Sequence, residues 1–215
     1  MLTWPQMATI IALISQKGGV GKSTLARALA REAAANGLKV KLGDLDTQQG
    51  TSTNWQRRRL DAAIEPGFSV EPFKTASQAL RAVEGFDCLV LDGPARASSA
   101  TLEISREASL VIQPTGASAD DLHPAVLVFH ELVRERIPRT RLVFALCRIG
   151  TDAEEAEARA YLTEAGFETL PGFILERPAY RQAQNIGLTI TETRFPQLNR
   201  RADELLQSVV DRING

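Results

Sequence analysis

A glycine-rich stretch at residues 16–24, QKGGVGKST, stands between an apolar run and a segment with helical periodicity. The run Ile10–Ile14 is short, continuous and apolar, which is typical of a strand buried on both faces. After the loop, apolar residues recur at helical spacing until Gly37, a common helix stop. Glycine backbones leave N–H groups free to surround an anion, and the first helical turn adds the positive end of its dipole. A strand, a glycine loop and a helix in this order therefore predict a phosphate-binding loop.

Two side chains in this loop have expected chemical roles. Lys22 should reach the terminal phosphates of a nucleotide, and the hydroxyl of Ser23 should ligate Mg²⁺. The standard pattern has glycine five residues before Gly21, but Gln16 occupies that position and a second lysine, Lys17, follows it. An ordinary surface loop is the alternative, and the flanking strand and helix argue strongly against it. We therefore interpret the loop as a nucleotide site.

Residues 17–24 resemble the deviant Walker A motif of the ParA/MinD superfamily of dimerising ATPases. The resemblance implies ATP and Mg²⁺ as ligands and a homodimer bridged by ATP, in which Lys17 reaches the nucleotide of the other subunit. It also implies that Lys17 and Lys22 act in catalysis. The nucleotide contacts that it implies come from Lys17, Gly18, Gly19, Val20, Gly21, Lys22, Ser23 and Thr24.

Beyond the loop, apolar runs alternate with segments of helical periodicity along the chain. This alternation predicts an α/β fold, a mainly parallel, doubly wound sheet of the P-loop NTPase type with helices on both faces. A length of 215 residues suits one well-buried domain and is short for two. We expect a single P-loop ATPase domain over residues 7–215 and a flexible leader over residues 1–6, with Met1 or Met7 as the natural start.

Four expectations concern individual segments. Thr51–Thr53 can cap a short helix that carries Trp55, and Trp55 suits a core position at least as well as a functional one. Leu170–Ile174 is expected to form a short strand. In the last helix, after Pro196, apolar residues fall on one face, which should cover the sheet.

The two cysteines limit the chemistry. Cys88 and Cys147 fall inside predicted strands, and no Cys-x-x-Cys spacing occurs, so zinc and iron–sulfur sites are unsupported. We interpret them as buried thiols in a reducing compartment, the cytoplasm. Proteins of the nitrogenase iron-protein type share this loop but need cysteines that hold a cluster between subunits, and two buried cysteines do not provide such an arrangement.

Acidic residues follow two predicted strands at the sheet edge where ligands bind in open α/β folds. Asp92 ends an apolar strand, and Asp92-Gly93-Pro94 resembles the family's Walker B segment, which implies that Asp92 holds Mg²⁺ through water. A turn-forming Asp is the alternative for this residue.

Residues 44–48, DLDTQ, resemble the family's switch segment, with Thr47 in place of the usual proline. The resemblance implies that Asp44 faces the water shell of the metal and that Asp46 positions the attacking water. A polar turn that caps the next helix is the alternative, and it is compatible with the same residues. The family often recognises adenine through an Asn after the sixth strand, where this chain has Cys147-Arg148, so the base contacts stay open.

Family resemblance also implies non-specific DNA binding, a small ParB-like or other cargo adaptor, and a plasmid, chromosome region or protein cluster as cargo. The formal net charge of −1 gives no global attraction to nucleic acid, so such binding needs a local patch. Residues 177–215 carry six arginines against four acidic residues, and Arg194, Arg200 and Arg201 are the candidate patch. A solvated face is the alternative. With ATP bound, the protein should associate with the nucleoid, and no helix-turn-helix segment precedes the loop, so contacts should be independent of DNA sequence.

A membrane-associated regulator resembling MinD is the alternative function. It requires a basic amphipathic tail that lies on anionic lipid. The last helix mixes arginines with Asp203, Glu204 and Asp211, and its apolar stripe is needed to cover the sheet. We therefore expect no membrane partner.

Overall fold

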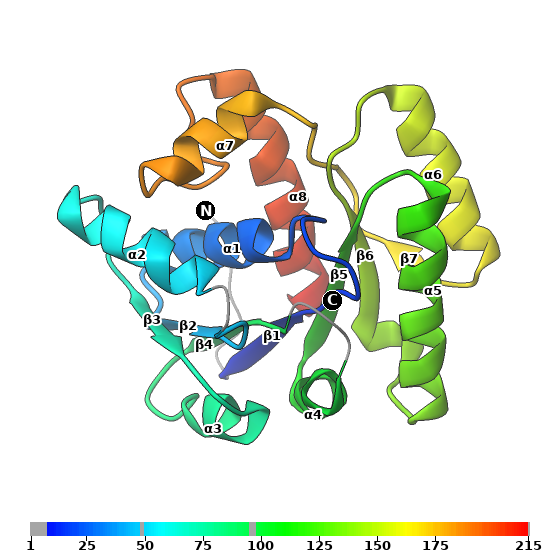
Figure 1. Cartoon of the computed structure of the whole chain (residues 1–215), viewed down its shortest axis with the longest axis horizontal. Helices are drawn as coiled ribbons and strands as arrows, with labels where there is room; N and C mark the ends of the chain where they lie inside the picture. Colours follow the sequence, from blue (N-terminus) through cyan, green and yellow to red (C-terminus); the bar gives the residue numbers. More distant parts are fainter. Residues whose placement is uncertain (1–7, 48–49, 95–97, 215) are drawn as a thin grey trace.

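The computed structural model describes residues 8–47, 50–94 and 98–214, and its core is one parallel sheet with the strand order β3-β2-β4-β1-β5-β6-β7 (Figure 1). The expected leader and Met7 lie outside the described residues. All strand pairs are parallel, which confirms the predicted fold class. The strands are β1 (Thr9–Leu13), β2 (Val40–Asp44), β3 (Ser69–Pro72), β4 (Cys88–Asp92), β5 (Leu110–Thr115), β6 (Leu142–Leu146) and β7 (Glu168–Thr169).

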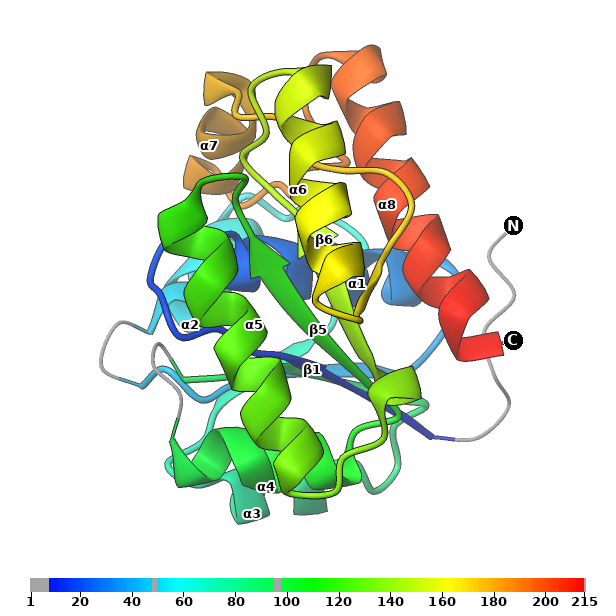
Figure 2. The same cartoon turned by 90° about the vertical axis from the view of Figure 1, so that its right-hand side faces the viewer.

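Helices cover both faces of this sheet, and the sheet divides the hydrophobic core into two clusters. One cluster lies under α1, α7 and α8, and the other lies under α3, α4, α5 and α6. Figure 2 shows α5 and α6 side by side along β5 and β6. The helices are α1 (Lys22–Ala35), α2 (Thr51–Asp61), α3 (Ala76–Arg81), α4 (Ser99–Glu107), α5 (Ala119–Arg134), α6 (Asp152–Glu164), α7 (Pro178–Asn185) and α8 (Pro196–Asn214), with a short 3₁₀ turn, η1, at Arg139–Arg141.

The central strand β1 serves both clusters, because successive side chains of a strand point to opposite faces. Ile11 and Leu13 belong to the cluster under α1, and Ala12 belongs to the other. The register aligns Leu13 of β1 with Asp92 of β4, and Asp92 with Asp44 of β2. Three adjacent strands therefore end at the same edge, with two carboxylates and the start of the glycine loop beside one another.

The apolar stripe of α8 packs on the sheet, as its periodicity predicts. Ala202, Leu205, Leu206, Val209 and Val210 are all buried. Full burial of a Leu or Val side chain contributes about 1.5–3 kcal/mol, so this stripe fixes the C-terminal helix. The stripe is consequently not available to lie on lipid. Among the described residues, no helix combines the length and apolar character needed to cross a membrane.

The expected strand at Leu170–Ile174 is wrong, because none of these residues belongs to a strand. The edge strand β7 covers only Glu168–Thr169, and beyond it a single parallel bridge joins Ile149 to Leu175. Pro171 and Gly172 interrupt the run, and Gly172 has a φ of +78° that extended strands do not adopt. Apolar content alone predicted the strand and ignored this turn.

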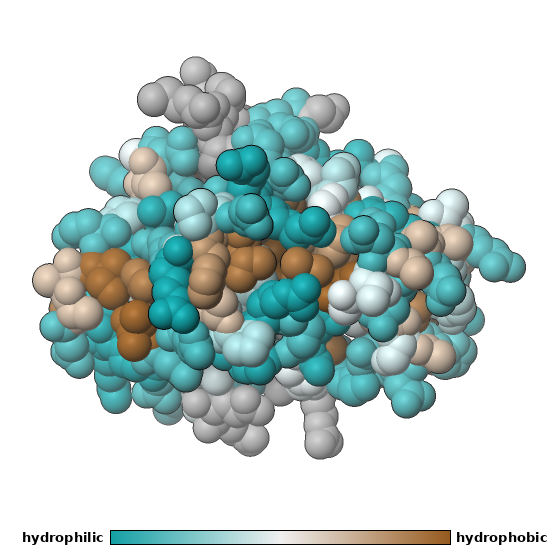
Figure 3. Space-filling model, turned by 90° about the horizontal axis from the view of Figure 1, so that it is seen from above, coloured by the Kyte–Doolittle hydropathy of each residue, from teal (hydrophilic) through white to brown (hydrophobic). Residues whose placement is uncertain are grey.

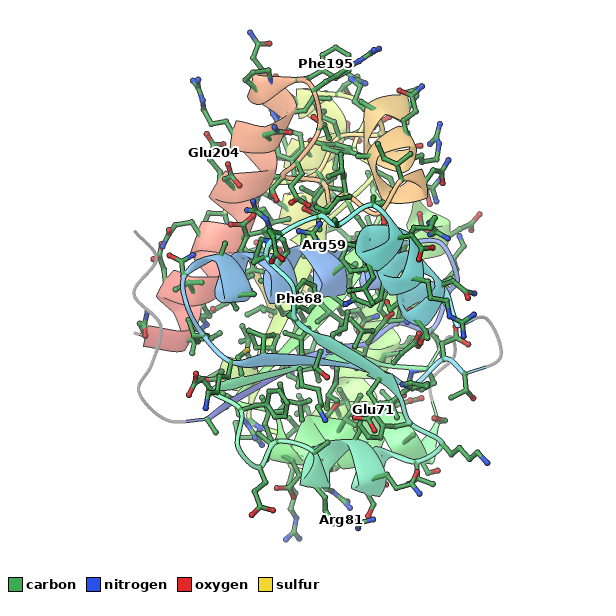
Figure 4. The ribbon with its side chains drawn as sticks, turned by 90° about the vertical axis from the view of Figure 1, so that its left-hand side faces the viewer. Arg59, Phe68, Glu71, Arg81, Phe195 and Glu204 are labelled. Atoms are coloured by element: carbon green, nitrogen blue, oxygen red, sulfur yellow. The ribbon has the colours of Figure 1, made fainter. Side chains whose placement is uncertain are left out.

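Buried polar contacts join α2 to the segment between α7 and α8. Arg59 is 1% exposed and forms an ion pair with Glu192 at 2.9 Å, and it also donates to the carbonyl of Gly187. The indole N–H of Trp55, which is fully buried, donates to the carbonyl of Leu188. In Figure 4 Arg59 lies near the middle of the view, and Phe195 and Glu204 lie toward its edges. Trp55 is thus a core residue that also anchors this segment.

Gly187 packs closely against α2, so a side chain at this position should disturb the contact between α2 and the segment that joins α7 to α8. Gly85 offers a matched control. Both have positive φ, +85° and +79°. A Cβ at Gly187 would lie 2.6 Å from the backbone nitrogen of Arg59, whereas a Cβ at Gly85 would meet nothing within 4 Å. Gly85→Ala should cost about 1–2 kcal/mol through the left-handed backbone. Gly187→Ala should cost a further ~1–3 kcal/mol through overpacking, measured as the free energy of unfolding in urea. Equal losses would contradict the close packing of α2 on this segment.

Candidate nucleotide-binding site

The glycine loop after β1 encloses a cavity of about 240 Å³ at the carboxyl edge of the sheet. Gly19 and Gly21 have φ values of +79° and +109°, which side-chain-bearing residues rarely adopt. A Cβ at Gly21 would also lie 3.1 Å from the Sγ of Cys147. Helix α1 begins directly after Gly21, so the N–H groups of its first turn have no partner within the helix. These groups and the helix dipole give the cavity the character of an anion site.

Lys22, which lines this cavity, forms a buried ion pair with Asp92. The Nζ of Lys22 lies 2.7 Å from Oδ1 of Asp92, and the two side chains are 8% and 0% exposed. The hydroxyl of Ser52, in the first turn of α2, donates to the other carboxylate oxygen at 2.8 Å. The structure therefore brings together the lysine and the carboxylate that the sequence assigned to phosphate and metal.

Asp44 caps the start of α2. Its Oδ2 accepts hydrogen bonds from the backbone N–H groups of Ser52 and Thr53, at 3.1 and 3.2 Å. The expectation that the hydroxyls of Thr51–Thr53 cap this helix is therefore wrong: the helix begins after Gly50, and Asp44 supplies the acceptor from β2. The hydroxyls face the site instead, where Thr51 lies 3.3 Å from the hydroxyl of Ser23.

The residues at this edge suit a divalent cation. Burial raises the pKa of Asp44, and the negative charge of Asp92 raises it further. A cation between the strand ends would relieve this repulsion, and carboxylate and hydroxyl oxygens are the ligands that Mg²⁺ prefers. Asp44, Asp92 and the hydroxyl of Ser23 are the residues that would hold it.

The two other predicted catalytic residues lie at the rim. Asp46 lines the cavity together with Lys17. The side chain of Lys17 is 52% exposed, and its Nζ lies 2.5 Å from Oδ1 of Asp121 at the start of α5. Gln48, the last residue of the segment that resembles the family's switch, lies outside the described residues.

Arg27 is a site residue that the sequence interpretation missed. It is 6% exposed and lines the cavity, and it donates to the hydroxyl of Ser52 at 3.2 Å and to Oε1 of Gln184 at 3.0 Å. Burial lowers the pKa of Arg27 to about 10. Helical spacing could have revealed it, because Arg27 lies four residues after Ser23 and hence on the same face of α1.

A second cavity, of about 250 Å³, adjoins the first and shares Gly19, Gly21 and Thr24 with it. Arg148 is on its wall, with a φ of +60°, and pairs with Glu176 at 2.9 Å. The hydrogen bond from Arg148 lowers the pKa of Glu176 although partial burial opposes the shift. Burial raises the pKa of Cys147, also in the wall, to about 12, so this thiol stays neutral. The position and size of the cavity suit the nucleoside part of a nucleotide bound at the loop.

The structure does not bring the expected DNA residues to this site. Arg194 and Arg200 are exposed near the start of α8, with Arg194 over the ring of Phe195 at 4.8 Å. Arg201 is partly buried over the ring of Phe173 at 4.6 Å. Figure 3 shows the molecule from above, with hydrophilic residues around a band of hydrophobic ones.

Comparison with known proteins agrees with this geometry. Residues 11–190 match the family described as the CobQ/CobB/MinD/ParA nucleotide binding domain. The chain is 30% identical over 186 residues to Maintenance of carboxysome distribution protein A of Gloeobacter kilaueensis, covering 86% of this chain and 85% of the relative. It is 31% identical over an alignment of 219 residues to the chromosome-partitioning ATPase Soj of Thermus thermophilus, covering 85% of this chain and 87% of the relative.

Among solved structures, the septum site-determining protein MinD of Pyrococcus horikoshii, complexed with Mg-ADP, has the same fold. The two chains are 18% identical with a TM-score of 0.73, and the match covers 97% of this chain and 98% of that one. The extent of the family match and the identity to the two relatives decide the classification. This chain belongs to the CobQ/CobB/MinD/ParA family of nucleotide-binding proteins, which includes the ParA and MinD ATPases.

Proposed function

We propose that this protein is a ParA-like, Mg²⁺-dependent ATPase that forms an ATP-bridged homodimer, binds DNA without sequence preference and positions a cargo. The buried Lys22–Asp92 pair under the glycine loop carries the enzymatic part of this proposal. The two relatives, named for carboxysome distribution and chromosome partitioning, support a positioning role. A small ParB-like or other adaptor protein would stimulate hydrolysis.

Phosphoryl transfer needs charge neutralisation and an oriented water more than covalent chemistry from the protein. Lys22 pairs with Asp92, and a phosphate in the cavity would offer the lysine a second anionic partner. With Lys22 on the phosphate, Asp92 and Asp44 would be the carboxylates available to hold Mg²⁺. Mg²⁺ bound there would polarise the phosphoryl oxygens and offset the charge of the leaving group.

Asp46 and Lys17 have the roles that complete the reaction. Asp46 lines the phosphate cavity and is proposed to orient the attacking water. Lys17 is held at the rim by Asp121 and is half exposed, so a small rotation of its side chain directs the ammonium group away from its own subunit. In the dimer this group would neutralise charge on the partner's nucleotide.

DNA contact is proposed for the exposed arginines near the start of α8. Arg194 and Arg200 are exposed, and Arg201 is partly buried. Arginine suits bidentate contact with phosphate oxygens, and such contacts carry no sequence information. The dimer would double the number of these contacts, which links DNA affinity to ATP.

Loss of Lys22 should abolish nucleotide binding. Lys22→Ala removes the charge that meets the phosphates, and we expect the affinity for ATP, measured by calorimetry, to fall by roughly 100-fold or more. It also leaves Asp92 buried without its partner, so thermal unfolding must show that the variant is folded at the assay temperature. Retained ATP binding by the folded variant would remove the loop from the mechanism.

Asp46→Ala should separate binding from hydrolysis. An oriented general base or water-positioning group contributes roughly 10²–10⁴-fold, so turnover should fall by about 100-fold or more while ATP binding and dimerisation persist. Thr47→Ala, at the next and exposed position, is the matched control and should hydrolyse ATP normally. Normal turnover in Asp46→Ala would reduce Asp46 to a turn residue.

Lys17→Ala tests the dimer. We expect it to bind ATP with an affinity close to that of the unaltered protein, because Lys17 is at the rim of its own cavity, yet to sediment as a monomer. The unaltered protein should sediment as a dimer with ATP and as a monomer with ADP or without nucleotide. An unaltered protein that stays monomeric with a non-hydrolysable ATP analogue would contradict the proposed function.

A further inference from the structure

A polar groove of about 590 Å³ lies between α2 and α7 and adjoins the phosphate cavity. The two spaces share Arg27 and Thr51. Figure 1 shows α7 above α2 on the same side of the molecule, with α1 beside them toward the centre. The groove is distinct from the expected DNA residues, because none of Arg194, Arg200 and Arg201 lines it.

The lining of this groove is basic. It includes Arg27 in the floor, Arg58 from α2 and Arg181 from α7, and it contains no acidic residue. Within residues 8–47, 50–94 and 98–214, neither Arg27 nor Arg58 has a carboxylate at ion-pair distance. Arg181 does pair with Glu176, at the surface. Two of the three guanidinium charges therefore lack a direct counter-ion in the described structure.

Arg27 makes the floor of the groove unusual. A buried charge is costly unless a group of opposite sign accompanies it, and here the guanidinium has only the hydroxyl of Ser52 and the amide oxygen of Gln184 as hydrogen-bond acceptors. The negative charges of Asp92 and Asp44 act on this guanidinium from beyond ion-pair distance, and an anion in the groove would add a direct charged partner.

We propose that this groove receives phosphate groups of the backbone of duplex DNA, an inference that rests on the DNA binding in the proposed function. The other lining groups are amides, a hydroxyl and one proline, including Asn54, Gln182 and Asn185. Guanidinium and amide groups are common donors to phosphate oxygens. The lining contains no aromatic side chain on which an unpaired base would stack, and no large apolar side chain that would anchor a peptide.

Side-chain hydrogen bonds connect the groove to the nucleotide site. Arg27 donates to Ser52, and Ser52 donates to Asp92. Gln184 accepts from both Arg27 and the hydroxyl of Thr24 in the glycine loop. A ligand that moves Arg27 therefore acts on groups that meet the nucleotide, and the linkage is reciprocal: ATP changes DNA affinity by the same factor as DNA changes ATP affinity.

The test is DNA binding by Arg58→Gln compared with Arg57→Gln. Both arginines are exposed on α2, but only Arg58 lines the groove. With MgATP, we measure the anisotropy of a labelled duplex of arbitrary sequence over a range of salt. Each phosphate contact contributes about 0.9 to the slope of log K against log salt concentration, so Arg58→Gln should reduce the slope by about 1 per subunit. Arg57→Gln should keep the slope of the unaltered protein, and Arg181→Gln should resemble Arg58→Gln.

The other outcomes distinguish failure of the groove inference from failure of the DNA binding in the proposed function. If the unaltered protein binds DNA and Arg58→Gln keeps its slope, or if Arg57→Gln loses as much, the groove inference is overturned and the DNA binding of the proposed function stands. If the unaltered protein binds no DNA with ATP, ADP or without nucleotide, the DNA part of the proposed function fails and this inference fails with it. If poly-L-glutamate displaces the duplex at equal charge concentration, the groove belongs to an acidic protein partner and the inference is again overturned.

Discussion

The site depends on one buried ion pair, Lys22 with Asp92, at the edge where three parallel strands end. Removal of one partner from such a pair costs about 3–5 kcal/mol because the other charge is left buried. The fold brings the partners together through β1 and β4, which lie side by side although 70 residues separate the two side chains. The register that aligns Leu13 with Asp92 therefore also sets where phosphate and metal would meet.

Local pattern predicts much of this molecule. The buried parallel strands are continuous apolar runs, and the glycines of the loop are required by backbone angles that other residues rarely adopt, so both features are visible in the sequence. Asp44 and Asp92 end two adjacent strands, as the apolar runs before them predict, and this edge is where ligands bind in open parallel sheets. These predictions succeed because the physical cause is within a few residues of the effect.

The features that escaped prediction depend on contacts between distant segments. Arg27 becomes a site residue only because α7 supplies Gln184 and α2 supplies Ser52, and no local pattern encodes either neighbour. The cap of α2 comes from Asp44 on the preceding strand rather than from the hydroxyls beside it. The run at Leu170–Ile174 is apolar enough for a strand, yet the turn at Pro171 and Gly172 takes precedence.

The ion pair between Arg59 and Glu192 has a mechanical consequence. It joins the far end of α2 to the chain before α8, while Arg31 of α1 holds the same Glu192 from the other side. Helix α2 and this chain segment are therefore expected to shift as one block when the groups at the start of α2 change partners. A rearrangement around the phosphates would then be transmitted through α2 and its ion pair to the chain between α7 and α8.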